Sequence, residues 1–189
     1  MSLEQLVDNS KTDKNTTHSY LPLYERILSS KKDSALNVLE IGIHKGGSIK
    51  LWADYFTNAK VYGVDVWSDD QMWSEITNKP NIHLYTSTDG YNQDFINSEF
   101  VNKNIKFDMA LDDGPHTLES MIQFIKLYLP LMADDGIFII EDVQNMSWLT
   151  TLSDAVPEDM KKYIEIFDLR TVKDRYDDIV FVVNKGLSV

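Results

Sequence analysis

The stretch "LNVLEIGIHKGGSIKLWADYF", residues 36–56, changes from one hydrophobic pattern to another within a few residues. Its first part, 36–42, is a short apolar run that ends in glycine, which is typical of a buried parallel strand. Its second part has apolar side chains at helical spacing: Ile49, Trp52, Ala53 and Phe56. We therefore expect a strand, a glycine turn and a helix in succession.

The same alternation continues along the chain. Further strands are expected at 60–66, 81–87, 106–113 and 136–143. Helices are expected at 93–102 and 117–132, the second broken near Pro130, and two closely linked strands at 163–170 and 177–185. The alternation predicts an α/β, Rossmann-like fold: a mostly parallel seven-stranded sheet with helices on both faces and one antiparallel edge strand. We expect a single domain over 1–189, with residues 1–30 as an N-terminal helical cover segment.

Composition restricts the partners. The 189 residues are 43% hydrophobic, and the formal net charge of -12 disfavours nucleic acid and anionic membranes. Without cysteine there is no disulfide, thiolate nucleophile or cysteine zinc site. The start of the chain is polar, and no apolar run approaches a membrane span. We expect a cytoplasmic protein that acts on a small molecule or glycan, and a homo-oligomer is compatible with this composition.

Acidic residues stand where the predicted central strands end. In open parallel sheets, ligands bind outside the carboxyl ends of the strands. The acids at those ends are Glu40, Asp65, Asp89, the pair Asp112–Asp113 and the pair Glu141–Asp142. Chance placement would scatter acids along both edges of the sheet, so this pattern favours a functional site.

The glycine turn "EIGIHKGGS", residues 40–48, suits a cofactor with a positive centre. Its glycines allow close backbone approach, but they lack the G-x-G-x-x-G order of dinucleotide sites. Glu40 would repel a pyrophosphate and could accept hydrogen bonds from a ligand ammonium. Asp65 is placed to accept both hydroxyls of a ribose. The set fits an adenosyl cofactor with an amino acid tail, although a glycine turn alone can be purely structural.

Five segments carry a resemblance to a known family: 12–25, 38–52, 61–66, 107–116 and 136–143. With them the chain resembles class I S-adenosylmethionine-dependent methyltransferases. Within that superfamily it is similar to the metal-dependent macrolide sugar O-methyltransferases and to the related rhamnosyl O-methyltransferase and cephalosporin hydroxylase group. The resemblance implies a Rossmann-like methyltransferase fold, S-adenosyl-L-methionine as cofactor, and O-methylation of a sugar hydroxyl on a glycan or glycosylated metabolite.

The resemblance also implies which residues hold the cofactor. Ser48, first in its helix, would contact the methionine carboxylate through its amide. The segment "TDKNTTH", 12–18, would fold over the cofactor, although a solvated turn explains it equally well. The implied cofactor residues are Glu40, Gly42, Gly47, Ser48, Asp65, Asp89 and Asp112, with Lys14 and His18 as further candidates.

Three carboxylates are expected to hold a metal ion. Strands 106–113 and 136–143 should be neighbours, and converging acids repel one another unless a cation lies between them. A hard divalent cation such as Mg²⁺ prefers oxygen ligands. A helix cap or solvated loop is the alternative for each acid pair. The resemblance assigns the metal to Asp113, Glu141 and Asp142.

His116 is the candidate catalytic base, together with Asp113. Its ordinary pKa of about 6.5 lets it accept a proton from an acceptor hydroxyl near neutral pH. Pro115 stands where relatives usually carry serine. The chain is also expected to lack the additional N-terminal domain of the longer macrolide enzymes.

Acceptor contacts are expected after strand 136–143 and near 66–75. The candidates are Gln144, Asn145, Trp148, Thr150, Trp67 and Trp73, although such aromatic residues often belong to the core. Two alternative functions remain at this stage: methylation of a catechol or other phenol, and a non-catalytic cofactor-binding subunit.

Overall fold

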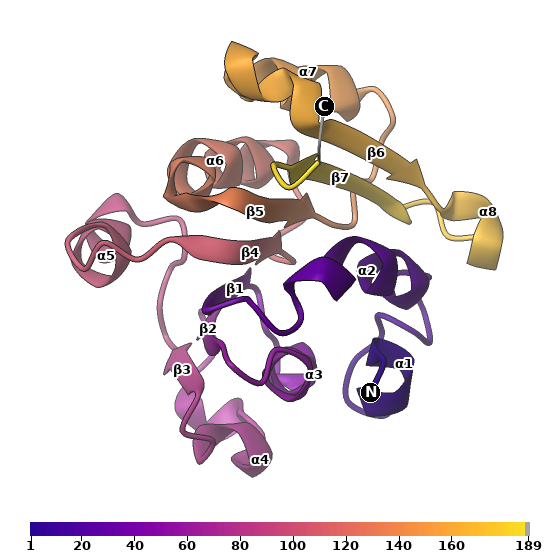
Figure 1. The fold of residues 1–189 in the computed structure, drawn as a ribbon. Coiled ribbons are helices and arrows are strands. Elements are labelled where there is room, and N and C mark those ends of the chain that lie inside the picture. The colour runs from indigo at the N-terminus through magenta and orange to yellow at the C-terminus, as the bar shows by residue number, and fades with distance from the viewer. Residues whose placement is uncertain (188–189) are drawn as a thin grey trace.

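The computed structural model describes residues 1–187 as a seven-stranded sheet between two layers of helices (Figure 1). The sheet order is β3-β2-β1-β4-β5-β7-β6. The strands are β1 (Asn37–Ile41), β2 (Lys60–Val64), β3 (Ile82–Tyr85), β4 (Phe107–Asp112), β5 (Met132–Ile140), β6 (Ile164–Asp168) and β7 (Ile179–Asn184). Strands β1 to β5 pair in parallel, whereas β7 pairs antiparallel with both β5 and β6. The predicted fold class is confirmed, with the antiparallel strand one place in from the edge.

The helices cover both faces of the sheet. They are α1 (Leu3–Leu6), α2 (Leu21–Leu28), α3 (Gly47–Tyr55), α4 (Ser74–Thr77), α5 (Gln93–Ile96), α6 (Leu118–Tyr128), α7 (Trp148–Ala155) and α8 (Arg170–Lys173). One buried apolar cluster joins α1, α2, α3 and α4 to one face of the sheet. The other joins α5, α6 and α7 to the opposite face. Successive strand residues alternate between the two clusters, as Val38 and Leu39 do, because strand side chains point to opposite faces.

Local sequence explains where α6 begins and ends. The Thr117 side chain accepts a hydrogen bond from the Ser120 backbone amide, and the Ser120 hydroxyl accepts one from the Thr117 amide, which completes a capping box. The helix ends at Tyr128, and Pro130 lies in a short 3-10 helix, Leu129–Leu131, that leads into β5. The predicted break near Pro130 is therefore present, because proline cannot donate a helical hydrogen bond.

The strand register brings the predicted acids to one edge. Ile41 at the end of β1 pairs with Val64 and with Asp112, and Asp112 pairs with Ile140. The residues that follow these strands are therefore neighbours. Because β7 runs the other way, its preceding residues Asp177 and Asp178 reach the same edge.

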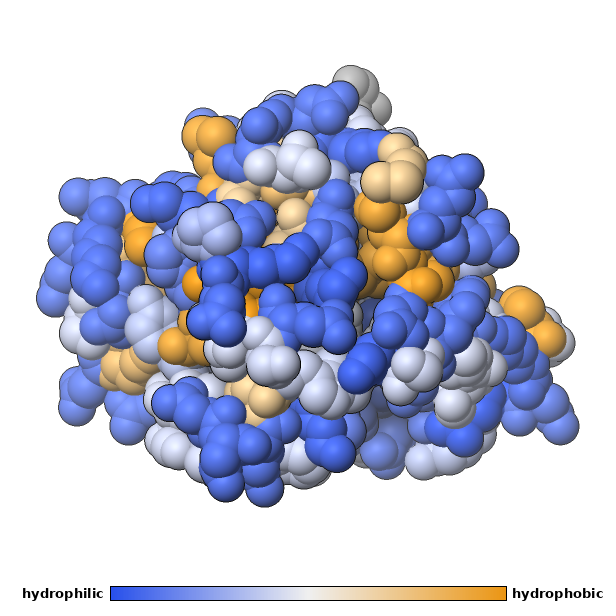
Figure 2. Space-filling model, turned by 90° about the horizontal axis from the view of Figure 1, so that it is seen from below, coloured by the Kyte–Doolittle hydropathy of each residue, from blue (hydrophilic) through white to orange (hydrophobic). Residues whose placement is uncertain are grey.

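The N-terminal segment, residues 8–20, lies at this edge between α1 and α2. Three backbone carbonyls of the segment, those of Asn15, Thr16 and His18, accept hydrogen bonds from the Lys173 ammonium at the end of α8. Among residues 1–187, no helix is long and apolar enough to cross a membrane. The face seen from below is mostly hydrophilic, and its apolar residues form separate groups (Figure 2).

Candidate functional site

A cavity of about 780 Å³ opens at the carboxyl edge of the sheet. Five stretches line it: residues 9–13, 41–44, 64–67, 88–91 and 113–116. Thr16, Gly47, Ser48 and Asp142 complete the lining in the described part of the chain. Of the predicted cofactor residues, the cavity is lined by Gly42, Gly47, Ser48, Asp65 and Asp89. The other four, Glu40, Asp112, Lys14 and His18, lie behind or beside it.

Two glycines of the turn are required by close protein contacts. Gly42 has a φ of +83°, and a Cβ there would lie 2.1 Å from the carbonyl oxygen of Asp113. A Cβ on Gly47 would lie 2.0 Å from the carbonyl oxygen of Lys11. Gly42 therefore lets the β1 and β4 loops meet, and Gly47 lets the N-terminal segment rest on the start of α3.

Asp65 organises the glycine turn. Its Oδ2 accepts hydrogen bonds from the amides of Ile43 (2.7 Å) and His44 (2.8 Å), and its Oδ1 accepts one from the amide of Trp67 (3.0 Å). A carboxylate offers about four acceptor positions. One position therefore remains on Oδ1 for a ligand hydroxyl, one fewer than the sequence suggested.

Lys14 lies inside the protein among three of the predicted acids. The residue is 1% exposed. Its Nζ donates to Asp113 Oδ2 at 2.8 Å and to Glu141 Oε1, and it lies 3.4 Å from Glu40 Oε1. Glu40 also accepts from Trp52 Nε1 at 2.8 Å, and Glu141 accepts from the Tyr24 hydroxyl. This set of Lys14, Glu40, Asp113 and Glu141 is called the Lys14 group below.

The charges of the Lys14 group do not cancel. Burial raises the pKa of Glu40 to about 7, although Lys14 opposes the shift. Burial and the neighbouring Asp113 charge raise the pKa of Glu141 well above its ordinary value. Burial would also raise the pKa of Asp113, but Lys14 and a hydrogen bond from His116 outweigh it and hold that pKa low. One ammonium cannot balance three carboxylates, two of them fully buried, so the group favours a proton on Glu40 or Glu141.

Asp113, His116 and Asp142 form the rim of the cavity. His116 Nε2 lies 3.1 Å from Asp113 Oδ1 and 3.5 Å from Asp142 Oδ2. Each of the three residues offers one ligand atom, and these atoms all lie within 4.8 Å of one another. Burial opposes charge on His116, but Asp113 and Asp142 outweigh it and raise the pKa of His116 to about 9.

Three of the six non-glycine residues with positive φ in the described part of the chain line the cavity. His116 has a φ of 56°, Asp142 of 55° and His44 of 51°, in the left-handed region that side chains rarely adopt. All three residues line the cavity. Such strain persists where the surroundings enforce it, often at functional sites.

His18 lies beside the cavity and joins the N-terminal segment to β7. Its Nδ1 lies 2.6 Å from Asp178 Oδ1 and 3.3 Å from Asp142 Oδ1. The Tyr20 hydroxyl donates to the same Asp142 oxygen, and the two rings stack with centroids 4.9 Å apart. Sequence reasoning missed Tyr20, Tyr24 and Asp178. The acidic pair before the last apolar run was the available signal for Asp178, because an antiparallel strand begins where its neighbours end.

The remaining candidates differ in exposure. Asp112 is buried, accepts a hydrogen bond from the Tyr91 hydroxyl at 2.5 Å, and has a pKa that burial raises to about 7. Asp89 is exposed at the cavity.

Of the predicted acceptor residues, Trp67 lines the cavity and contacts His44 edge to face, whereas Trp148 packs against the apolar core. Trp73 lies under the Lys11 ammonium, 4.0 Å from its ring centroid.

The fold and the site define a Rossmann-like protein with a cavity, lined in part by carboxylates, at the carboxyl ends of its parallel strands. A family model described as a methyltransferase domain matches residues 39–143, from β1 to the residues just after β5. The match covers more than half of the chain. The chain therefore belongs to this family of methyltransferase domains.

The chain is also similar to O-methyltransferases of Streptomyces. It is 26% identical over 144 residues to the 8-demethyl-8-alpha-L-rhamnosyl tetracenomycin-C 2'-O-methyltransferase of Streptomyces olivaceus, covering 72% of this chain and 36% of that protein. It is 27% identical over 158 residues to the L-olivosyl-oleandolide 3-O-methyltransferase of Streptomyces antibioticus, covering 77% of this chain and 38% of that protein. The chain thus spans less than two fifths of the length of these relatives.

Among solved structures, the fold resembles the MycE methyltransferase of mycinamycin biosynthesis. The complex of MycE with Mg, SAH and mycinamycin VI superimposes with a TM-score of 0.74 at 20% identity, covering 97% of this chain and 53% of MycE. A crystal form with Mg and SAH gives a TM-score of 0.73 and covers all of this chain. At this identity the likeness shows the shared fold.

Proposed function

We propose that the chain is an S-adenosyl-L-methionine-dependent, Mg²⁺-dependent O-methyltransferase that acts on a sugar hydroxyl of a glycan or glycosylated metabolite. The observation that carries this proposal is the cavity at the sheet edge, with Asp113, His116 and Asp142 on its rim. Membership of the methyltransferase domain family supports the cofactor. Relatives named for methylating rhamnosyl and olivosyl groups support the acceptor.

The cavity fits the proposed cofactor. Its volume of about 780 Å³ lies within the range of small-molecule sites, roughly 300–1,000 Å³. Asp65 has one acceptor position left for a ribose hydroxyl. The N-terminus of α3 at Ser48 offers backbone amides to a carboxylate. Glu40 lies behind Lys14, so we assign it to the support of the site.

The rim fits a hard divalent cation. Asp113 and Asp142 face each other across His116, and all three line the cavity. Glu141 differs because its two oxygens already accept from Lys14 and Tyr24. We propose that Asp113 and Asp142 hold the metal, and that Glu141 joins them only if Lys14 moves. When bound, the cation would stabilise negative charge on the acceptor oxygen and lower the pKa of His116.

His116 would accept the proton that the acceptor hydroxyl loses. Its Nε2 is held by Asp113 at 3.1 Å, which fixes the ring at the cavity rim. In the proposed reaction the acceptor oxygen would gain the methyl group of S-adenosyl-L-methionine, whose sulfonium would be left as a neutral thioether. The O–H proton would go to the His116 ring nitrogen that does not donate to Asp113. A base must be unprotonated to act. Because Asp113 and Asp142 raise the pKa of His116 to about 9, activity near neutral pH requires a cation that offsets the charges of these two carboxylates.

Mass spectrometry of acceptor panels tests the proposal. The chain is mixed with S-adenosyl-L-methionine and Mg²⁺ over a panel of glycosides and catechols, and we expect a gain of one methyl group on a glycoside. Chelation and Asp113→Asn should each abolish the gain, and Asp159→Asn, which changes an exposed aspartate, should not. Activity that survives both chelation and Asp113→Asn contradicts the metal mechanism. Methylation of catechols alone would contradict the sugar acceptor.

A further inference from the structure

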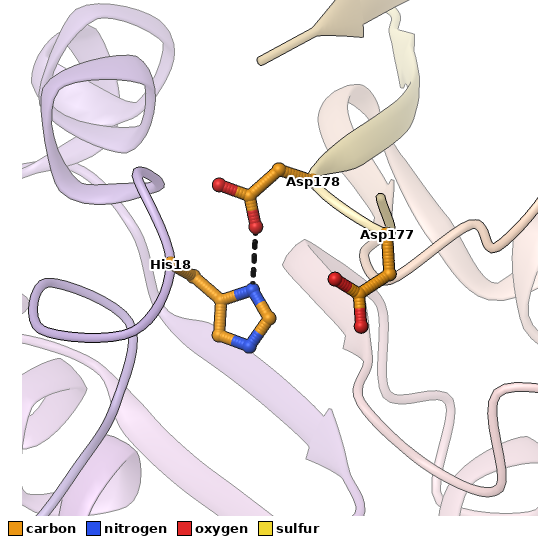
Figure 3. Close-up of side chains that lie close together, drawn as sticks. All are labelled: His18, Asp177 and Asp178. Atoms are coloured by element: carbon orange, nitrogen blue, oxygen red, sulfur yellow. Dashed lines mark hydrogen bonds and ion pairs between the residues drawn. The ribbon is translucent and has the colours of Figure 1, made fainter. Parts of the chain in front are cut away.

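A second group of metal-ligating side chains lies at the same sheet edge, beside the cavity. It consists of His18, Asp177 and Asp178, whose ligand atoms all lie within 4.8 Å of one another. All three residues are buried, with exposed fractions of 5%, 8% and 0%. Figure 3 shows both carboxylates turned toward the imidazole ring. The N-terminal segment supplies the histidine, and the start of β7 supplies the two acids.

The side chains around His18 bring several possible ligand atoms together. His18 Nδ1 lies 2.6 Å from Asp178 Oδ1 within the group, and 3.3 Å from Asp142 Oδ1 outside it. Ligand atoms on one tetrahedral zinc ion are about 3.3 Å apart, so the direct hydrogen bond between His18 and Asp178 would lengthen on metal binding. His18 Nε2 points toward Asp13, whose Oδ2 is 3.7 Å away. A carboxylate on the far ring nitrogen is a common partner of a metal-bound histidine.

Unpartnered buried polar atoms are an independent sign of a ligand here. Among the described residues, four buried side-chain polar atoms lack a hydrogen-bond partner, and three belong to Ser19, Arg175 and Asp177. Asp177 Oδ2 pairs with the Arg175 guanidinium at 3.0 Å, which leaves Oδ1 without a partner. Ser19 directly follows His18, and its amide donates to Asp178. The unpartnered acceptor Asp177 Oδ1 indicates a missing water or cation, whereas the Arg175 Nε–H is a donor that only an acceptor such as water can satisfy.

The charges around the group favour a divalent cation over an anion. Four carboxylates surround His18: those of Asp13, Asp142, Asp177 and Asp178. Of these carboxylates, Asp177 is paired with the Arg175 guanidinium at 3.0 Å, whereas the nearby Lys173 ammonium donates to backbone carbonyls, that of His18 among them. With His18 as a ligand the second site would favour Zn²⁺, whereas the ligands proposed for Mg²⁺ at the rim are carboxylates alone, because His116 is assigned there to the proton.

We propose that His18, Asp177 and Asp178 form a second cation site, selective for Zn²⁺ and separate from the rim site at Asp113. Asp142 lies between the two sites, because one of its oxygens faces His18 and the other faces His116. A cation at the second site would fasten the N-terminal segment to β7. The cavity wall formed by residues 9–13 would then be held in place.

Calorimetric titration of the metal-free chain with Zn²⁺ tests this site. The titration uses the Asp113→Asn background, because the rim residues also combine one imidazole with two carboxylates. We expect Asp113→Asn to bind one Zn²⁺ and to melt at a higher temperature with it. Adding Asp177→Asn should weaken that binding on the order of tenfold or more. Adding Asp174→Asn, which removes an exposed charge from the same loop, should leave it unchanged.

The asparagine at 177 keeps an acceptor for Arg175, and far-UV circular dichroism checks that each variant folds. Equal Zn²⁺ affinity with and without Asp177→Asn overturns the proposal. So does an Asp113→Asn variant that folds but binds no Zn²⁺. Neither result affects the proposed methyl transfer, which is read from the mass of the acceptor.

Discussion

Glu141 and Asp142 are neighbours in the sequence but have opposite surroundings in the structure. Glu141 is 1% exposed, and its carboxylate is held by Lys14 and Tyr24 inside the Lys14 group. Asp142 has a left-handed backbone and turns its carboxylate to the cavity, between His18 and His116. A place at the end of a strand therefore does not settle the role of an acid. Both carboxylates are buried and accept a hydrogen bond from a tyrosine, but Glu141 faces the Lys14 ammonium, whereas Asp142 faces two imidazole rings and lines the cavity.

The largest effect should come from removing the internal ammonium. Lys14→Met keeps most of the side-chain volume but leaves two buried carboxyl groups, Glu40 and Glu141, and the partly exposed Asp113 without the ammonium that contacts them. Breaking a buried ion pair from one side costs about 3–5 kcal/mol. Urea unfolding should show a loss of this size, against a change within about 0.5 kcal/mol for Lys45→Met at an exposed position. Similar unfolding midpoints for Lys14→Met and wild type would mean that the ammonium does not stabilise this group.

A smaller loss is expected where the N-terminal segment meets the glycine turn. Gly47→Ala would place a Cβ 2.0 Å from the Lys11 carbonyl oxygen, so the segment must shift away. Overpacking of this kind costs about 1–3 kcal/mol. Thermal unfolding and the rate of tryptic cleavage within residues 8–20 should both report it. Gly186→Ala is the control, because its nearest contact would be 3.3 Å. Unchanged stability and cleavage in Gly47→Ala would argue against close packing here.

Measurements of metal affinity should distinguish the role of Asp142 from that of Glu141. Asp142→Asn should weaken Mn²⁺ binding at the rim about tenfold or more, or about 1.4 kcal/mol, because it removes a proposed ligand. Glu141→Gln should change it much less, since Lys14 and Tyr24 already hold that side chain. Electron paramagnetic resonance counts free Mn²⁺ during the titration, with Zn²⁺ absent. An equal loss of Mn²⁺ affinity in the two variants would mean that Glu141 is a metal ligand and that Lys14 moves away from it when the metal binds.

The smallest expected effect is a pH dependence of the metal-free chain. The pKa of His116 is raised to about 9, above its ordinary value of about 6.5. The charged ring therefore stabilises the fold fully below a pH of about 6.5, and this contribution is lost as the pH rises through about 9. The difference in unfolding free energy between wild type and His116→Gln should shrink over that interval. Proton NMR should find the His116 ring titrating above neutral pH. A ring that titrates near 6.5 would contradict the contacts with Asp113 and Asp142.

The sequence predicted those parts of the fold and site that depend on local pattern. Apolar runs located the seven strands, and the parallel connections implied that acids after β1, β2, β4 and β5 would meet. It could not reveal that Lys14 reaches Glu141, because the two residues are 127 positions apart and no periodicity links them. Nor could it show that three backbone amides donate hydrogen bonds to the Asp65 carboxylate and so use three of its acceptor positions. Asp177 and Asp178 were missed because only β7 of the described strands approaches this edge from the opposite direction.

Calorimetric titration with S-adenosylhomocysteine shows whether the cavity binds the demethylated form of the proposed cofactor, and it needs no knowledge of the acceptor. The proposal predicts one molecule bound per chain, and binding that largely persists when Mg²⁺ is removed by a chelator. Asp65→Ala should weaken it, since Asp65 shapes the turn and faces the cavity. A folded wild-type chain that binds no S-adenosylhomocysteine, with or without Mg²⁺, would contradict the account.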